Sequence, residues 1–227
     1  ANNIAGLIVE PTKSAYPNHN KDLFQKFIDR GVPILYIHAA YPNIPGSSLV
    51  EDDIEAGYLA TKHLVELGHR RIGGLFKNDD LQGHGRYAGM IKCLREYECP
   101  IDEEAIVWFG TEDMKRLFND HHAEELLGAW RDVTGLVCYN DQIAMGVMSM
   151  AKTRQLRIPG DYSLVSFDNS NLAQNAEAGL TTIAHPKELL GRKAADMILT
   201  LLQKKPQLIQ EVMRPELIVR DSAQAID

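Results

Sequence analysis

Seven side chains carry groups that match the hydroxyls of a sugar, which both donate and accept hydrogen bonds. They are Arg86, Asn140, Asp168, His38, Lys77, His185 and Tyr139. A guanidinium, a carboxylate or an amide can grip two neighbouring hydroxyls at once. Each charge-assisted hydrogen bond contributes about 1.5 to 3 kcal/mol, and an unmatched group costs a similar amount. These residue types predict selective binding of a small sugar, although on spacing alone an exposed helix position is the better interpretation of Arg86.

Aromatic rings can cover the C–H side of such a ligand. The candidates for this role are Tyr139, Trp108 and Phe167. The guanidinium of Arg86 is expected to project into a wet cleft, so its removal is expected to weaken binding with little effect on stability.

Three other motifs match catalytic or cofactor sites only in part. Gly83, Gly85 and Gly89 have the spacing G-x-G-x-x-x-G, and a long loop is expected between them and the preceding strand, whereas a dinucleotide site needs a tight turn. The pair His121-His122 lacks further metal ligands and is expected on a solvated helix face. The acidic pair Asp79-Asp80 is expected to line a polar loop. No catalytic residue, metal or cofactor is therefore predicted.

The elements that would position the sugar-binding groups alternate between apolar strands and amphipathic helices. Buried parallel strands are expected over Ile4 to Val9, Ile34 to Ile37, Ile72 to Phe76, Ile106 to Phe109, Leu136 to Tyr139 and Leu164 to Phe167. Helices are expected over Lys21 to Arg30, Asp52 to Leu67, Arg86 to Tyr97, Asp141 to Arg154 and Lys187 to Lys204. This alternation predicts doubly wound α/β sheets, whose ligands bind beyond the carboxyl ends of the strands.

Composition narrows the function classes. The chain of 227 residues is 44% apolar and 24% charged, and no segment reaches the roughly 18 apolar residues of a membrane span. A net charge of -7 has the wrong sign for binding a phosphate backbone, so we expect no measurable affinity of this chain alone for DNA. Three cysteines without a C-x-x-C pair, and no visible signal peptide, favour free thiols and a cytoplasmic protein.

Strings along almost the whole chain resemble the effector-binding core of the lactose/galactose repressor family. They are Val50–Gly57, Leu67–Gly73, Arg86–Gly89, Asn140–Gly146, Ile158–Asn169, Leu180–Ile183 and Pro215–Ser222. The resemblance implies the type I periplasmic binding protein fold, with two doubly wound parallel-sheet lobes joined by a three-strand hinge. It implies an N-terminal lobe of residues 1–50 plus 186–214 and a C-terminal lobe of residues 51–185 plus 215–227. It also implies that the lobes close on the ligand, so that operator DNA is released.

The family's sugar-binding positions can be carried over residue by residue. Its arginine, asparagine and aspartate fall on Arg86, Asn140 and Asp168. His38 stands where the family usually has aspartate, and His185 where it often has glutamine. These two histidines fit either ligand contacts or structural roles at the hinge.

Within the family, the strings Ile8–Ser14, Phe76–Gly83 and Cys138–Asp141 are most similar to repressors of arabinose utilisation. This similarity implies L-arabinose as the inducer, a homodimer, and a GntR-type DNA-binding domain upstream of the core. In the family two βα units also precede the segment that starts at Ala1, so we expect the N-terminal lobe to be incomplete in this sequence. The alternative is a periplasmic sugar-binding protein of a transporter, which shares the fold and the cleft.

Overall fold

The computed structural model describes residues 4–203 and 207–226, and the chain divides into two compact units. Unit 1 comprises Ala1–Asp52, Asp80–Gln82 and Pro186–Arg214, and unit 2 comprises Asp53–Asp79, Gly83–His185 and Pro215–Asp227. Each unit is built around its own sheet, so the predicted α/β class with parallel sheets is confirmed. Within the described residues, no helix is long and apolar enough to cross a membrane.

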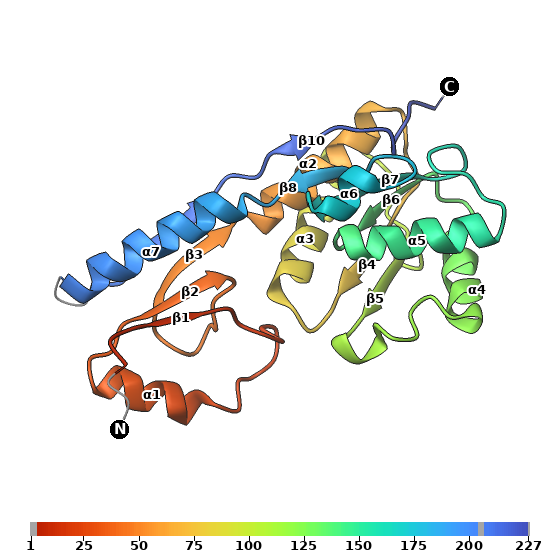
Figure 1. Cartoon of the computed structure of the whole chain (residues 1–227). Coiled ribbons are helices and arrows are strands. Elements are labelled where there is room, and N and C mark those ends of the chain that lie inside the picture. Colours follow the sequence, from red (N-terminus) through yellow and green to blue (C-terminus); the bar gives the residue numbers. More distant parts are fainter. Residues whose placement is uncertain (1–3, 204–206, 227) are drawn as a thin grey trace. The chain divides into compact units, whose positions relative to one another are not determined.

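Unit 1 contains a four-stranded parallel sheet in the order β1-β2-β3-β9. Its elements are β1 (Leu7–Val9), α1 (Lys21–Asp29), β2 (Ile34–His38), β3 (Ser47–Glu51), α7 (Lys187–Gln203) and β9 (Gln210–Met213). In Figure 1 the red and orange strands and the blue helix α7 belong to this unit, although they come from distant parts of the sequence. The expected strand from Ile4 is shorter than predicted, and Lys204 of the expected last helix lies outside the described residues.

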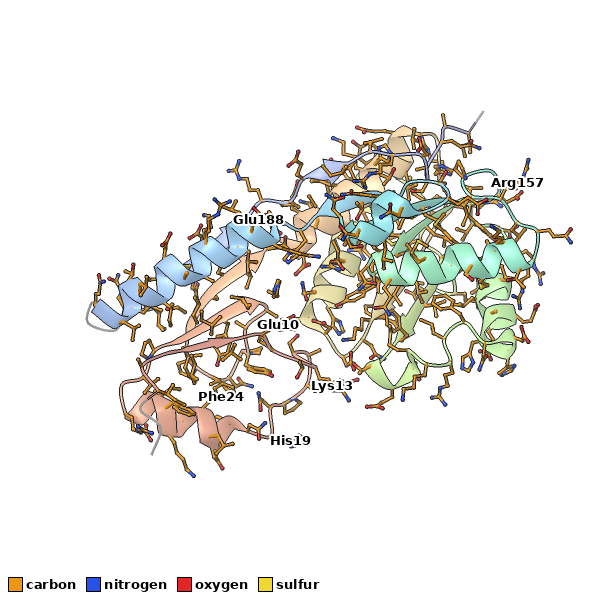
Figure 2. All side chains as sticks on the ribbon, viewed as in Figure 1. Glu10, Lys13, His19, Phe24, Arg157 and Glu188 are labelled. Carbon is orange, nitrogen blue, oxygen red and sulfur yellow. The ribbon has the colours of Figure 1, made fainter. Side chains whose placement is uncertain are left out.

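The two faces of the unit 1 sheet are covered by different helices. Side chains alternate along β2, so that Leu35 packs with α7 while Ile34 and Tyr36 pack with residues of α1. Phe24 of α1, labelled in Figure 2, lies with its ring centroid 6.4 Å from that of Tyr36. Since both faces of β2 are covered, this strand is a run of apolar residues, as the sequence predicts.

Unit 2 contains a six-stranded sheet in the order β10-β8-β7-β6-β4-β5. Its strands are β4 (Ile72–Lys77), β5 (Ile106–Phe109), β6 (Gly135–Cys138), β7 (Ser163–Asp168), β8 (Thr181–Ala184) and β10 (Leu217–Ile218). Its helices are α2 (Asp53–Glu66), α3 (Leu81–Glu96), α4 (Asp120–Ala129), α5 (Asp141–Thr153) and α6 (Asn171–Asn175), with a 3-10 turn at Thr111–Asp113. All strand pairs are parallel except β10 with β8.

Two apolar clusters cover the faces of the unit 2 sheet. Leu75, which points to one face of β4, packs in a cluster with residues of α4 and α5, while its neighbour Phe76 packs with residues of α2 and α3. Helices on both faces make this sheet doubly wound, as the alternation of strands and helices predicts. Ligand-binding groups are therefore expected just beyond the carboxyl ends of the parallel strands of this sheet.

The three cysteines are buried and none of them forms a disulfide, which confirms the prediction of free thiols. Burial raises the pKa of Cys93 and of Cys138 to about 12. These thiols therefore stay protonated and unreactive at neutral pH.

His69 is a buried histidine that joins three segments of unit 2. Its Nδ1 lies 2.9 Å from Thr134 Oγ1 and its Nε2 lies 3.1 Å from the carbonyl oxygen of Gln224. Burial lowers the pKa of His69, and burial likewise lowers the pKa of His63. The folded protein therefore holds these imidazoles neutral at a pH where the unfolded chain takes up protons.

We expect the stability of the protein to fall as the pH drops from about 7 toward 5. Above the unfolded pKa of about 6.5 both states are neutral, and below it the unfolded state binds more protons, at about 1.4 kcal/mol per pH unit for each group. Urea unfolding at several pH values measures this slope. His69→Gln removes one of the two groups, so its slope in this pH range is expected to be shallower. An unchanged slope would contradict a role of His69 in the acid sensitivity.

Candidate functional site

The guanidinium of Arg86 lies at the centre of the candidate site, inside unit 2. Arg86 is only 4% exposed, and its Nε donates to Asp53 Oδ1 at 3.0 Å while one Nη donates to the carbonyl oxygen of Tyr139 at 2.5 Å. Its Cζ lies 4.4 Å from the ring centroid of Phe167 and 5.0 Å from that of Tyr139. The interpretation of Arg86 as an exposed helix residue is therefore wrong.

The same geometry corrects the expectation that Arg86 contributes little to stability. Asp53 begins α2, Tyr139 follows β6 and Phe167 lies in β7, so one guanidinium connects three elements. A buried guanidinium that is paired and hydrogen-bonded cannot be removed without leaving its partners unmatched. Arg86 is thus part of the packed structure of unit 2 and, at the same time, a candidate ligand group.

Acidic side chains keep the buried Arg86 charged, and Asp168 is one of them. Burial alone would lower the pKa of Arg86, but the negative charges of Asp53 and Asp168 and the hydrogen bond to Asp53 raise it above its usual value. Asp168 ends β7 in the left-handed backbone region, with φ of 103°. An aspartate carboxylate near a buried guanidinium offers acceptors next to donors, which is the pattern that adjacent sugar hydroxyls require.

Asn140 caps the N-terminus of α5 next to this cluster. Its side-chain Oδ1 accepts a hydrogen bond from the backbone N–H of Ile143 at 3.0 Å, and its own backbone is extended. The cap occupies the amide oxygen, so the amide NH2 is the group that Asn140 can offer to a ligand. The structure therefore brings Arg86, Asn140, Asp168 and Tyr139 together around the ends of β6 and β7.

The aromatic candidates have different surroundings from those expected. Phe167 is 1% exposed and stacks under Arg86, so its ring does not present a free face to a ligand. Trp108 is half-buried in a cluster with Phe76, Tyr87 and His84 on β4, β5 and α3. Tyr139 is 9% exposed, with its ring edge-on to Phe109. Of these three rings, Phe167 is corrected from a sugar-facing residue to a support for Arg86.

Lys77 ends β4, and its Nζ lies 3.4 Å from Asp79 Oδ1. Asp79 is buried and its Oδ2 accepts from the backbone N–H of Thr111 at 2.9 Å. Burial alone would raise the pKa of Asp79, but the Thr111 N–H and the Lys77 ammonium lower it below its usual value. This ionised carboxylate organises the turn after β4, in agreement with the prediction that the acidic pair lines a polar loop.

The two histidines predicted as ligand groups belong to different units. His38 ends β2 of unit 1 with φ of 66°, and His185 follows β8 of unit 2. Both side chains are half-buried. Their contribution to a sugar site stays a prediction.

The three glycines that resemble a dinucleotide motif lie inside α3, which begins at Leu81, so the long loop expected before them is wrong. A Cβ on Gly89 would lie 2.0 Å from the carbonyl oxygen of Ile54 in α2, and one on Gly83 would lie 2.0 Å from that of Lys77. These glycines permit close packing of α3 against its neighbours. His121 lies exposed on α4, as predicted for a solvated face, whereas His122 on the same helix is half-buried.

Two groups that organise the site were not singled out from the sequence. Asp53 pairs with Arg86, and Asp141 binds the hydroxyls of Ser166 and Thr182. Both aspartates lie within the family strings, but their partners lie 25 to 41 residues away in the sequence. Sequence spacing alone contains no signal for such long-range pairs.

Comparisons with known proteins agree with this architecture. The family model described as a periplasmic binding protein-like domain matches residues 61–223. Two curated relatives share the name arabinose metabolism transcriptional repressor. The one from Geobacillus stearothermophilus is 36% identical over 232 residues, and the one from Halalkalibacterium halodurans is 38% identical over 229 residues. The alignments cover 98% and 96% of this chain but 62% and 60% of those relatives.

Solved structures show the same fold. A complex named transcriptional regulator CelR with cellobiose superposes with a TM-score of 0.82 at 24% identity, covering 97% of this chain and 66% of the other. A LacI family transcriptional regulator from Enterococcus faecium with bound ribose also reaches 0.82, at 23% identity, covering 98% and 81%. From the family match over residues 61–223, together with these folds, the chain belongs to the periplasmic binding protein-like family.

Proposed function

We propose that this chain is the effector-binding domain of a LacI-type transcriptional repressor and that its effector is L-arabinose. The observation that carries the proposal is the buried Arg86 guanidinium, which interacts electrostatically with Asp168 and donates to the carbonyl oxygen of Tyr139, the residue before the Asn140 cap. This arrangement offers a fixed donor fork, a carboxylate and an amide to one small polyhydroxy ligand. The two relatives named as arabinose repressors support the choice of sugar.

In this proposal, operator binding belongs to a separate DNA-binding domain in a homodimer. The net charge of -7 supports that division, because nucleic-acid affinity depends on lysine and arginine side chains that release counterions. Binding of the sugar and binding of the operator must then be coupled reciprocally. The alternative of a transporter's periplasmic binding protein is not favoured, since the similar proteins described above are named as transcriptional regulators.

Calorimetric titration of the protein with L-arabinose, D-galactose and a purine base tests the ligand. We expect L-arabinose to bind and D-galactose to bind more weakly, because each mismatched hydroxyl leaves a polar group of the site unpaired at a cost of about 1 to 3 kcal/mol. Tight binding of the purine without binding of either monosaccharide would overturn the proposal. Thermal unfolding in the presence of each ligand serves as an independent readout, since a bound ligand raises the midpoint.

A further inference from the structure

The carboxylate of Asp141 is one of the most completely hydrogen-bonded groups in unit 2. Asp141 is 1% exposed and is the first residue of α5. Its Oδ1 accepts from Ser166 Oγ at 2.5 Å and from Thr182 Oγ1 at 2.8 Å. Its Oδ2 accepts from both the backbone N–H and the hydroxyl of Ser170, at 2.7 and 2.8 Å. Four donors and the N-terminal end of a helix compensate the burial of this charge.

Two of these bonds hold the loop that carries Asp168. The loop runs from Asp168 to Ser170, between β7 and α6. Asp168 and Asn169 both have positive φ, 103° and 44°, a region that L-residues other than asparagine and aspartate rarely adopt. The φ of Asp168 also lies beyond the usual left-handed range, so this backbone needs support from its surroundings. The contacts of Ser170 with Asp141 fix the far end of this strained pair.

The middle of the loop is held by further side chains from the same unit. The backbone N–H of Asn169 donates to Thr182 Oγ1 at 3.3 Å, and Arg220 Nη donates to Asn169 Oδ1 at 2.6 Å. Thr182 thus contacts both the loop and Asp141. All of these contacts involve Asn169 and Ser170, the two residues that follow Asp168. They therefore fix the backbone on the C-terminal side of Asp168.

We infer that Asp141 is a positioning residue for ligand binding, acting through the Asp168–Ser170 loop. This inference rests on the proposed function, in which Asp168 binds the sugar. Without the carboxylate, the N–H of Ser170 loses its acceptor, and the loop can relax to ordinary negative-φ backbone. The Asp168 carboxylate then leaves its place at the end of β7, and the sugar loses one of its acceptors.

Asp141→Ala and Asp141→Asn test the inference, with Ser222→Ala as the matched control. Asparagine retains an oxygen for the Ser170 N–H, while the hydroxyls of Ser166 and Thr182 can rotate to accept from its amide nitrogen. Ser222 is likewise fully buried, bonding Leu164 O at 2.7 Å and the Thr181 N–H at 2.8 Å, but it does not touch the loop. Its loss lowers stability through the same strands β7 and β8.

We expect the dissociation constant for L-arabinose, measured below each variant's melting transition, to rise at least tenfold in Asp141→Ala. It is expected to stay within about threefold of wild type in Asp141→Asn and to be unchanged in Ser222→Ala. Amide hydrogen exchange at Asn169 and Ser170, measured without sugar, is expected to accelerate in Asp141→Ala alone. Wild-type affinity in folded Asp141→Ala, or an equal loss in Ser222→Ala, would overturn the inference.

The exchange measurement separates this inference from the proposed function. If the wild-type protein binds no sugar, the proposed function fails, while unchanged exchange at Asn169 and Ser170 in Asp141→Ala would independently refute the positioning role. Should Asp141→Ala not fold, Thr182→Val takes its place. Valine keeps the shape of the strand residue but removes the hydroxyl that contacts both Asp141 and Asn169. Unchanged affinity and unchanged exchange in Thr182→Val would then count against the inference.

Discussion

Replacing Arg86 by alanine is expected to weaken L-arabinose binding more than a hundredfold and to destabilise unit 2 at the same time. The loss of binding corresponds to about 3 kcal/mol, from one or two charge-assisted bonds lost and sugar hydroxyls left unpaired. The loss of stability, also about 3 kcal/mol, follows from leaving Asp53 and the Tyr139 carbonyl without their buried donor. Titration below the melting transition and urea unfolding measure the two effects separately.

Asp53→Asn is the matched control for Arg86→Ala. This substitution removes the charge of the partner but leaves the guanidinium in the chain, so it lowers stability while retaining most of the sugar affinity. If both variants lose affinity in the same proportion to their loss of stability, Arg86 is a structural residue and not a ligand group. Wild-type affinity in folded Arg86→Ala would lead to the same conclusion.

Gly57→Ala is expected to be among the most destabilising single-methyl additions in unit 2. A Cβ at this position in α2 would lie 2.0 Å from the carbonyl oxygen of Arg86 in α3, a backbone atom that cannot move by rotation of a side chain. The two helices must therefore separate, at a cost of about 3 kcal/mol or more, and Arg86 moves with its helix. We expect lower sugar affinity as well as lower stability.

Gly128→Ala provides the opposite expectation. Gly128 lies in α4, and a Cβ there would meet no atom within 4 Å. Alanine is favoured over glycine in a helix by up to about 1 kcal/mol, so this variant is expected to be as stable as wild type or more stable. Urea midpoints of the two variants give the comparison, and a Gly57→Ala protein as stable as wild type would contradict the close packing of α2 and α3.

The sequence predicts the elements whose signals are local. Ile106–Phe109 is found as a strand with the expected bounds, and the helices at Lys21, Asp141 and Lys187 begin where predicted. An apolar run indicates a strand that is buried on both faces of a sheet, and apolar residues three or four apart indicate a helix. Both patterns can be seen within a short stretch of sequence. The prediction was therefore correct for elements whose buried positions are all apolar.

The elements that were not predicted include the polar strands β3 and β8, the short helix α6, and the glycine-rich first turn of α3. β3 contains Ser47 and Ser48, both buried, and the hydroxyl of Ser47 accepts a hydrogen bond from Ile209 N in the chain before β9. β8 begins with Thr181 and Thr182, whose hydroxyls are satisfied by distant partners. A buried hydroxyl is acceptable only once its partner is in place, and that partner cannot be read from neighbouring residues.

For the candidate site, the sequence indicated the ligand groups better than their supports. Arg86, Asn140 and Asp168 were assigned from the family resemblance, and the structure brings them together. The burial of Arg86 and its pairing with Asp53 were not predicted, because they depend on how α2 approaches α3 across two glycines. Packing of this kind is a property of the assembled unit.

The chain order of the unit 1 sheet has a consequence for synthesis on the ribosome. β3 is completed early, but its neighbour β9 lies far downstream, and the bond between Ser47 and Ile209 spans 162 residues. At about 5 to 20 residues per second, β3 waits on the order of 10 to 30 seconds for this partner. Meanwhile β4 to β8 of unit 2 emerge without interruption. We therefore expect the β4 to β8 part of unit 2 to fold first and β10 to join it last. The nascent β3 edge meanwhile depends on chaperones to avoid pairing with other chains.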